Sequence, residues 1–168
     1  PLVRSFLIGV LREVEGIITN RGSDTDKARE QQVEGEFFFR IVDAFISPDN
    51  PTGSSRIHAQ FTGDLNSVVA DTIVSDISKG ILGQLKRGLS EVGTNFLSNK
   101  NQALLAVERL SLYAGIFAAD LQLRLNALQR AKLENAIRDL REAVLAGDAD
   151  RAVALRSILM QVITEYES

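Results

Sequence analysis

The sequence predicts a mainly α fold, a helical bundle of five to six helices with a long C-terminal helix and a terminal helical hairpin. Apolar residues recur at spacings of three and four along most of the chain, as they do on amphipathic helices. Residues 101–145 contain no proline and only one glycine, Gly115. With 168 residues, 45% of them hydrophobic, the chain is long enough to bury one core. We therefore expect a single helical domain over 1–168.

N-terminal helices are expected within residues 1–46. The first has apolar residues at helical spacing, namely Val3, Leu7, Val10, Val14 and Ile17. Pro1 suits its first turn, because the missing N–H has no partner to lose there. The second has a competing interpretation, a strand over residues 36–46, since three phenylalanines follow one another. A strand would place Asp43 on the same face as Phe37 and Phe39, so a helix is the preferred interpretation.

Residues 47–62 are expected to form a loop. Their first part, SPDNPTGSS, contains two prolines, a glycine, an asparagine and three serines, all residues that interrupt regular structure. Residues 56–62 could add a short β element, although an isolated pair of strands is only marginally stable.

Residues 63–98 are predicted to hold glycine-punctuated helices. Apolar residues follow helical spacing from Leu65 to Phe96, but four glycines lie among them: Gly80, Gly83, Gly88 and Gly93. Each glycine inside a helix costs about 0.5–1 kcal/mol relative to alanine. We expect a break near Gly80 or Gly88, because one unbroken helix would need tertiary support.

A long helix is expected over 101–145 and a final helix over 148–166, joined as an antiparallel hairpin. We expect Gly147 to end the long helix and Asp148 to cap the N-terminus of the final helix. One straight helix over 101–145 would span roughly 65 Å at 1.5 Å per residue, more than a compact domain of this size covers. It either bends where its apolar pattern slips, between Leu128 and Leu133, or projects and finds a partner.

A projecting helix predicts a self-association face. Its candidate residues are Leu110, Phe117, Leu121, Leu125 and Leu128. Exposed apolar patches of more than a few hundred Å² are rare on monomers, and identical chains commonly pair about a two-fold axis. We therefore expect a homo-oligomer or a helical protein partner.

Composition excludes several kinds of chemistry. The chain has no cysteine, which excludes disulfides, thiolate ligands and thiolate nucleophiles. His58 is its only histidine, so one chain cannot supply a site with two imidazoles. We expect no catalytic, metal or cofactor site, and the preferred function is a non-enzymatic structural, assembly or adaptor protein.

The first alternative is a small enzyme or ligand-binding bundle that uses His58 and carboxylates. Ser54 and Ser55 lie close to His58 in the sequence, which suggests a nucleophile and its base. The carboxylates considered as partners or metal ligands are Glu30, Glu34, Asp71, Asp76 and Glu134. His58 lacks the glutamate three residues earlier that carboxylate-bridged two-metal bundles use. We therefore expect His58 to be dispensable.

A second alternative is a nucleic-acid-associated protein. The stretch 86–132 carries seven Lys or Arg residues against three Asp or Glu residues, a local balance of 7 − 3 = +4. The whole chain has a net charge of −3, so a broad electrostatic attraction to nucleic acid is not expected.

The expected compartment is the cytoplasm. The apolar run Ser5 to Leu11 is flanked by charged residues and is far shorter than the roughly 20 residues of a spanning helix. The N-terminal segment also lacks the strongly basic face of helices that lie on membranes. We therefore expect neither a transmembrane segment nor peripheral membrane contact.

Overall fold

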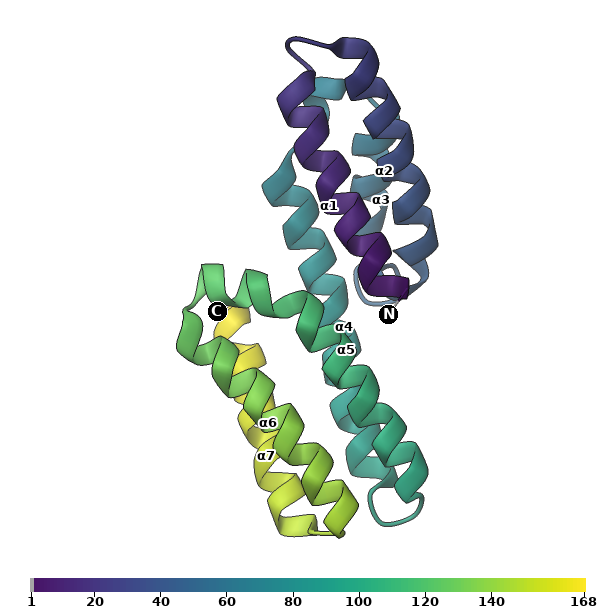
Figure 1. Cartoon of the computed structure of the whole chain (residues 1–168). Coiled ribbons are helices and arrows are strands. Elements are labelled where there is room, and N and C mark those ends of the chain that lie inside the picture. The colour runs from purple at the N-terminus through teal and green to yellow at the C-terminus, as the bar shows by residue number, and fades with distance from the viewer. Residues whose placement is uncertain (1) are drawn as a thin grey trace. The chain divides into compact units, whose positions relative to one another are not determined.

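The computed structural model describes residues 2–168, and it confirms the mainly α prediction (Figure 1). Within these residues it has seven α-helices rather than five to six, one short 3-10 helix and no strand. The expected helix start at Pro1 lies outside the described residues. The helices are α1 (Leu2–Asn20), α2 (Thr25–Ile46), α3 (Pro51–Thr62), η1 (Leu65–Ser67), α4 (Ala70–Asn95), α5 (Lys100–Arg124), α6 (Ala127–Ala146) and α7 (Ala149–Glu167).

Contacts divide the chain into two compact units, with the boundary inside α4. The first unit runs up to Ile81 and the second unit is Leu82–Ser168. That the whole chain behaves as a single domain stays a prediction.

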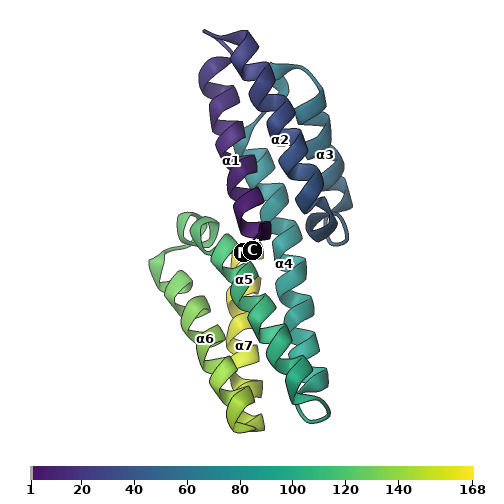
Figure 2. The same ribbon diagram turned by 45° about the vertical axis from the view of Figure 1, so that its right-hand side comes forward.

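The first unit is built from α1, α2, α3 and the first part of α4. α1 packs along α2 as a hairpin, and α3 packs on α2 (Figures 1 and 2). Its core includes fully buried side chains from all four helices, among them Val10, Ile17, Phe39, Ile57 and Ile73. Residues 36–46 lie inside α2, which confirms the helical interpretation over the strand. Phe39, Val42 and Ile46 are buried at spacings of three and four, as one face of a helix requires.

The second unit is built from the rest of α4 and from α5, α6 and α7. α6 packs against both α5 and α7. Its core includes the buried side chains Leu85, Val92, Val107, Leu140 and Leu159. The predicted terminal hairpin of α6 and α7 is confirmed. Gly147 ends α6 with a left-handed φ of 73°, and the Asp148 side chain caps α7 by accepting from the Arg151 N–H at 3.0 Å.

The predicted loop over 47–62 is confirmed for residues 47–50, which form a turn between helices. It is wrong for residues 51–62, and so is the possible β element near 56–62, because residues 51–62 form α3. Pro51 occupies the first turn of the helix, where proline is favourable. Asn50 caps the helix, since its side chain accepts from the Gly53 N–H at 3.0 Å. Residues that suggested a loop are therefore the start signal of a helix.

The predicted break of α4 near Gly80 or Gly88 is wrong, because the helix runs unbroken from Ala70 to Asn95. Both glycines lie where another helix approaches closely. A Cβ on Gly80 would lie 2.8 Å from Ile46 Cγ2 and 2.9 Å from Ile46 Cα, and one on Gly88 would lie 2.8 Å from Leu110 Cδ2. These contacts supply the tertiary support that an unbroken helix needs.

The predicted single helix over 101–145 is also wrong, because it consists of α5 and α6. Leu125 leaves helical geometry at φ −107° and ψ −87°. Asn126 then caps α6 by accepting from the Gln129 N–H at 2.9 Å. The chain therefore changes direction just before the slip in the apolar pattern. Of the two alternatives for this stretch, a bend and a projecting helix, the structure shows the bend.

Candidate functional site

The five predicted self-association residues fall into two groups. Leu110, Phe117 and Leu121 are at most 1% exposed and belong to the core of the second unit. Leu110 lies against Gly88, and the Phe117 ring packs edge-on against Tyr166 with centroids 4.6 Å apart. These three side chains are already covered within the chain.

The other two predicted residues lie at the corner between α5 and α6. Leu125 is half-buried at the end of α5, whereas Leu128, in the first turn of α6, is 73% exposed. Leu128 is therefore the predicted residue that is available to another molecule.

Leu128 lies at one end of a groove between α6 and α7, which we call the α6–α7 groove. Its volume is about 530 Å³. The residues that line it are Leu128, Gln129, Ala131, Lys132, Asn135, Ala136, Asp139, Leu155 and Ile158. The α6 residues recur at spacings of three and four, so they share one face of the helix. The groove combines apolar side chains from both helices with one cation and one carboxylate.

The two charged side chains of the α6–α7 groove differ in their partners. Asp139 accepts from the guanidinium of its neighbour Arg138 at 3.2 Å. Lys132 forms no hydrogen bond or ion pair within residues 2–168 and is only half-buried. Its ammonium can therefore pair with a carboxylate from outside the chain.

A second apolar surface lies on α2. Val33 is 70% exposed, Phe37 60% and Ile41 38%. These residues are four apart, so they form one continuous stripe on the helix. We call them the α2 stripe.

His58 lies in a polar cluster between α3 and α2. Its Nδ1 is 3.0 and 3.1 Å from the two carboxylate oxygens of Glu36, and its Nε2 is 3.7 Å from Asp43 Oδ2. Arg40 Nε donates to Glu36 at 2.8 Å. The His58 ring also packs edge-on against Phe39. The cluster ties α3 to α2 through side chains that are largely paired with one another.

The predicted pairing of a serine hydroxyl with His58 is not present, because each hydroxyl donates to another acceptor. Ser54 Oγ donates to Asp43 Oδ1 at 2.5 Å, and Ser55 Oγ donates to the Pro51 carbonyl at 3.0 Å. Neither hydroxyl donates to His58. Residues one turn apart on a helix share a face, but here both hydroxyls donate to Asp43 and to the backbone instead.

A buried ion pair also involves α3, and the sequence does not predict it. Both carboxylate oxygens of Asp76, on α4, accept from Arg56 on α3, at 2.7 and 3.0 Å. The Asp76 side chain is 2% exposed, whereas that of Arg56 is 50% exposed. Asn50 donates to the Asp76 carbonyl at 2.9 Å. The pair therefore joins α3 to α4 with the bidentate geometry that arginine favours.

A further charged group is buried on α1. The Glu13 side chain is 4% exposed and accepts from the Arg12 guanidinium at 2.6 and 2.9 Å. This hydrogen bond, helped by the negative charge of Glu13, raises the pKa of Arg12 above its usual value. The pair satisfies a carboxylate that would otherwise be costly to bury.

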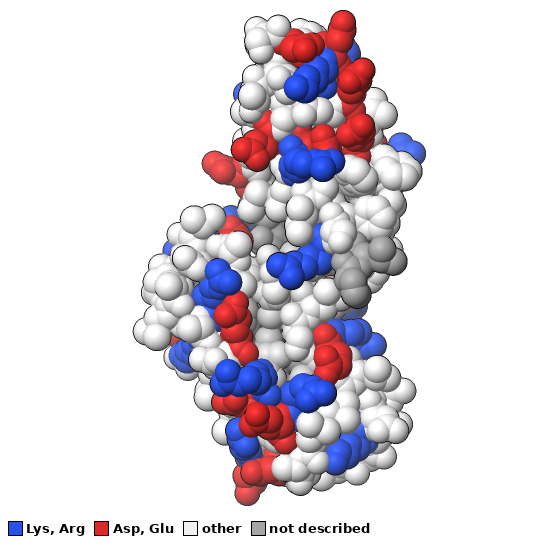
Figure 3. Space-filling model, viewed as in Figure 1, with Lys and Arg blue, Asp and Glu red and all other residues white. Residues whose placement is uncertain are grey.

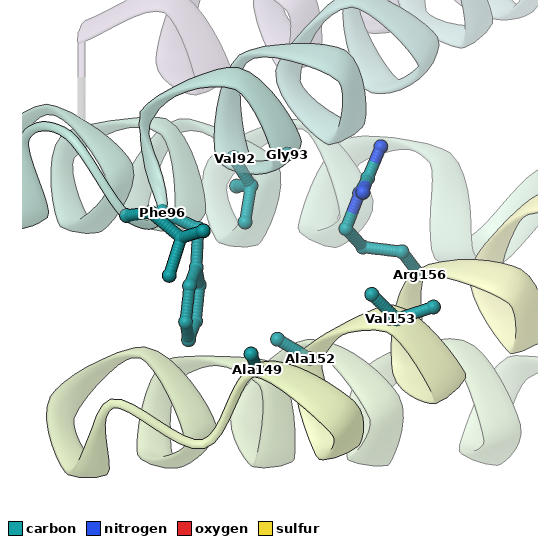
Figure 4. Close-up of a pocket in the computed structure, with 8 residues that line it drawn as sticks. Val92, Gly93, Phe96, Ala149, Ala152, Val153 and Arg156 are labelled. Carbon is teal, nitrogen blue, oxygen red and sulfur yellow. The ribbon is translucent and has the colours of Figure 1, made fainter.

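A small apolar cavity of about 110 Å³ lies between the end of α4 and the start of α7 (Figure 4). Phe96 and Val92 point toward α7, where Ala149 and Ala152 form the opposite wall. The Arg156 guanidinium lies against Gly93, and its Nε donates to the Leu89 carbonyl at 2.8 Å. Arg156 therefore ties α7 to α4 beside the cavity.

The basic stretch 86–132 contributes many of its cations to ion pairs within the second unit. Arg109 pairs with Glu91, and Lys86 with Glu167 at 2.6 Å. Arg124 pairs with Asp120 and Arg130 with Glu134 on successive turns of their helices. Figure 3 shows basic and acidic side chains mixed over the viewed face of this unit. These cations neutralise carboxylates of the chain itself.

Searches of residues 2–168 found neither a cluster of three metal-ligating side chains nor a helix with the length and hydropathy needed to span a bilayer. Comparisons of the chain with protein-family models, with curated proteins and with solved structures found no match.

Proposed function

We propose that the protein is a structural or assembly component that acts through helix-mediated self-association. The observation that carries this proposal is the α6–α7 groove with the exposed Leu128 at its end. Burying apolar surface is worth about 25 cal/mol per Å², so a groove lined by leucine, isoleucine and alanine side chains gains free energy when another helix covers it.

The α2 stripe supports the same class of function. Phe37 and Val33 are more than half exposed in the middle of a long helix, where water surrounds them in a single chain. Aromatic and aliphatic side chains at four-residue spacing are typical anchors for a helix that docks on another helix. A helical partner protein on the α2 stripe is therefore the second form of this proposal.

A solution measurement tests the proposal. Light scattering on the full chain at tens of micromolar should give a mass above the 18.4 kDa of one copy. Backbone hydrogen exchange should be slower in concentrated than in dilute protein, at the helices that a second copy covers. A mass of one chain at all concentrations, with unchanged exchange, would contradict self-association.

The alternative of a small enzyme or ligand-binding bundle depends on the His58 cluster. In its favour, His58 lies in one cluster with three other polar side chains, those of Glu36, Asp43 and Ser54. The pairing of these groups with one another equally suits a role in holding α3 to α2. Replacement of His58 distinguishes a catalytic role from a structural one, because a catalytic histidine would be needed for turnover and not for the fold.

A further inference from the structure

We propose that the α6–α7 groove binds a second copy of this chain, with the two α6 helices antiparallel about a two-fold axis that passes between Asn135 and Ala136. This inference rests on the proposed function, because it names the partner and the surface of that self-association. Its basis is the charge pattern of the groove.

The groove's two charged residues lie at equal distances from the proposed axis. Lys132 and Asp139 are seven residues apart, so they face the same side of α6, two turns from each other. Their midpoint falls between Asn135 and Ala136. A two-fold axis at this midpoint reverses the second helix and sets Lys132 opposite the partner's Asp139, and Asp139 opposite the partner's Lys132.

The same charge pattern disfavours the other orientation. Two parallel α6 helices in register would set Lys132 against the partner's Lys132 and Asp139 against the partner's Asp139. Like charges at such close range repel each other and disfavour that arrangement. A symmetric pairing with opposite charges in contact therefore requires the antiparallel orientation.

The apolar lining fits a helix as the occupant. Ala131 and Ala136 are small, so they let a second backbone approach α6 closely. Leu155 and Ile158 of α7 are half-buried on the other side of the groove. Leu128, at 73% exposure, is the large apolar side chain that the pairing would remove from water. A two-fold interface uses each of these contacts twice.

The available cation also points to a carboxylate from outside the chain. Lys132 has no ion-pair partner within residues 2–168, and Asp139 pairs with a neighbour in sequence that is largely exposed. A second copy supplies a carboxylate for Lys132 and a second cation for Asp139 from one surface. Many other partner proteins could offer a carboxylate, but a second copy is complementary by symmetry.

Charge reversal tests the pairing on the full chain. Sedimentation equilibrium should show that Lys132→Glu alone, or Asp139→Lys alone, weakens dimerisation by about tenfold, because each variant sets like charges together at two places. An equimolar mixture of the two variants should regain wild-type dimerisation, because each mixed pair has opposite charges at both places. The double variant should also regain it. High salt should reduce all of these differences.

The control is Lys27→Glu, the same change at an exposed lysine of α2, which should leave dimerisation unchanged. Circular dichroism checks that every variant keeps its helices. If the wild type is a dimer but each single charge-reversal variant dimerises to the same extent as the equimolar mixture of the two, the assigned surface is wrong. The proposed function would still stand. A wild type that sediments as one chain would overturn both self-association and this inference.

Discussion

At the scale of single residues, the ion pair of Arg56 and Asp76 holds a carboxylate that is 2% exposed, compared with 4% for Glu13 and 12% for Glu36 in two other ion pairs of the first unit. The Asp76 carboxylate is almost fully buried, and both of its oxygens accept from Arg56. Removal of one partner from a buried pair leaves an uncompensated charge. We expect Arg56→Met to lower the free energy of unfolding by about 2–3 kcal/mol, since the exposed side of the pair admits some water.

Urea denaturation measures this loss. Arg56→Lys serves as the control, because it keeps the positive charge but loses the bidentate geometry, and it should cost less than Arg56→Met. Equal stability of Arg56→Met and the wild type would show that the pair does not hold α3 to α4.

His58 should tolerate replacement, as expected from the sequence. Glu36 keeps its hydrogen bond from Arg40 when His58 is lost, and the His58 ring is about one-third exposed. We expect His58→Gln to change the free energy of unfolding by about 1 kcal/mol or less, with helicity and mass in solution unchanged. Thermal denaturation and light scattering check this. A variant that folds normally but loses an activity of the wild type would favour the enzyme alternative.

The sequence predicts some of these residue-scale features and misses others for a physical reason. Asp148 is predicted as a cap because capping is local and acts within three residues. Arg56 and Asp76 are twenty residues apart, and only the packing of α3 against α4 brings them together. Long-range pairs of this kind leave no periodic signal in one sequence.

At the scale of elements, replacing a glycine of α4 by alanine tests whether the cost of overpacking outweighs the gain in helix propensity. Gly80→Ala adds a Cβ that lies 2.9 Å from the backbone Cα of Ile46, so a helix must move. Overpacking of this kind typically costs 1–3 kcal/mol, and we expect a net loss of about 1–2 kcal/mol after the gain in helix propensity. Urea denaturation should show the lower stability.

Gly115→Ala is the matched control on α5. A Cβ at Gly115 meets no atom within 4 Å, so the change should stabilise the protein by about 0.5–1 kcal/mol through helix propensity alone. Stabilisation by both substitutions would show that α4 is not held closely against Ile46.

The errors in the element predictions share one cause. Pro51 and Gly53 suggested a loop but start α3, and Gly80 suggested a break but lies at a close contact. Proline and glycine each have several uses in a fold, and the use depends on neighbours that the local sequence does not specify. The amphipathic spacing of α1, α2 and α7 was predicted, because burial of one helix face is a periodic property.

At the scale of the whole molecule, the two leucines Leu121 and Leu128 should respond differently to charge. Leu121 is fully buried in the second unit, so Leu121→Asp should unfold it. Leu128→Asp adds a charge to an exposed position and should reduce the mass in solution while the helices remain. Circular dichroism and light scattering on both variants check this contrast. Loss of helicity in Leu128→Asp, or a folded monomer in Leu121→Asp, would contradict it.

The sequence located only part of the candidate surface. The sequence predicts Leu128, but Leu110, Phe117 and Leu121 are covered within the second unit. The helix α6 packs against α5, Leu110 lies against Gly88, and the Phe117 ring contacts Tyr166. The groove itself depends on how α6 and α7 pack, so neither its volume nor the roles of Lys132 and Asp139 follow from periodicity. The self-association that the sequence suggested stays a prediction.

A single introduced cysteine tests the central claim most directly, because the chain has no cysteine of its own. Asn135 lies next to the proposed two-fold axis, where two copies of one residue come within the roughly 7 Å between Cα atoms that a disulfide needs. Under mild oxidation of dilute protein, Asn135→Cys should form a covalent dimer rapidly, whereas Lys27→Cys, at an exposed position on α2 outside the α2 stripe, should not. Equally slow crosslinking of the two variants would contradict the pairing of α6 helices.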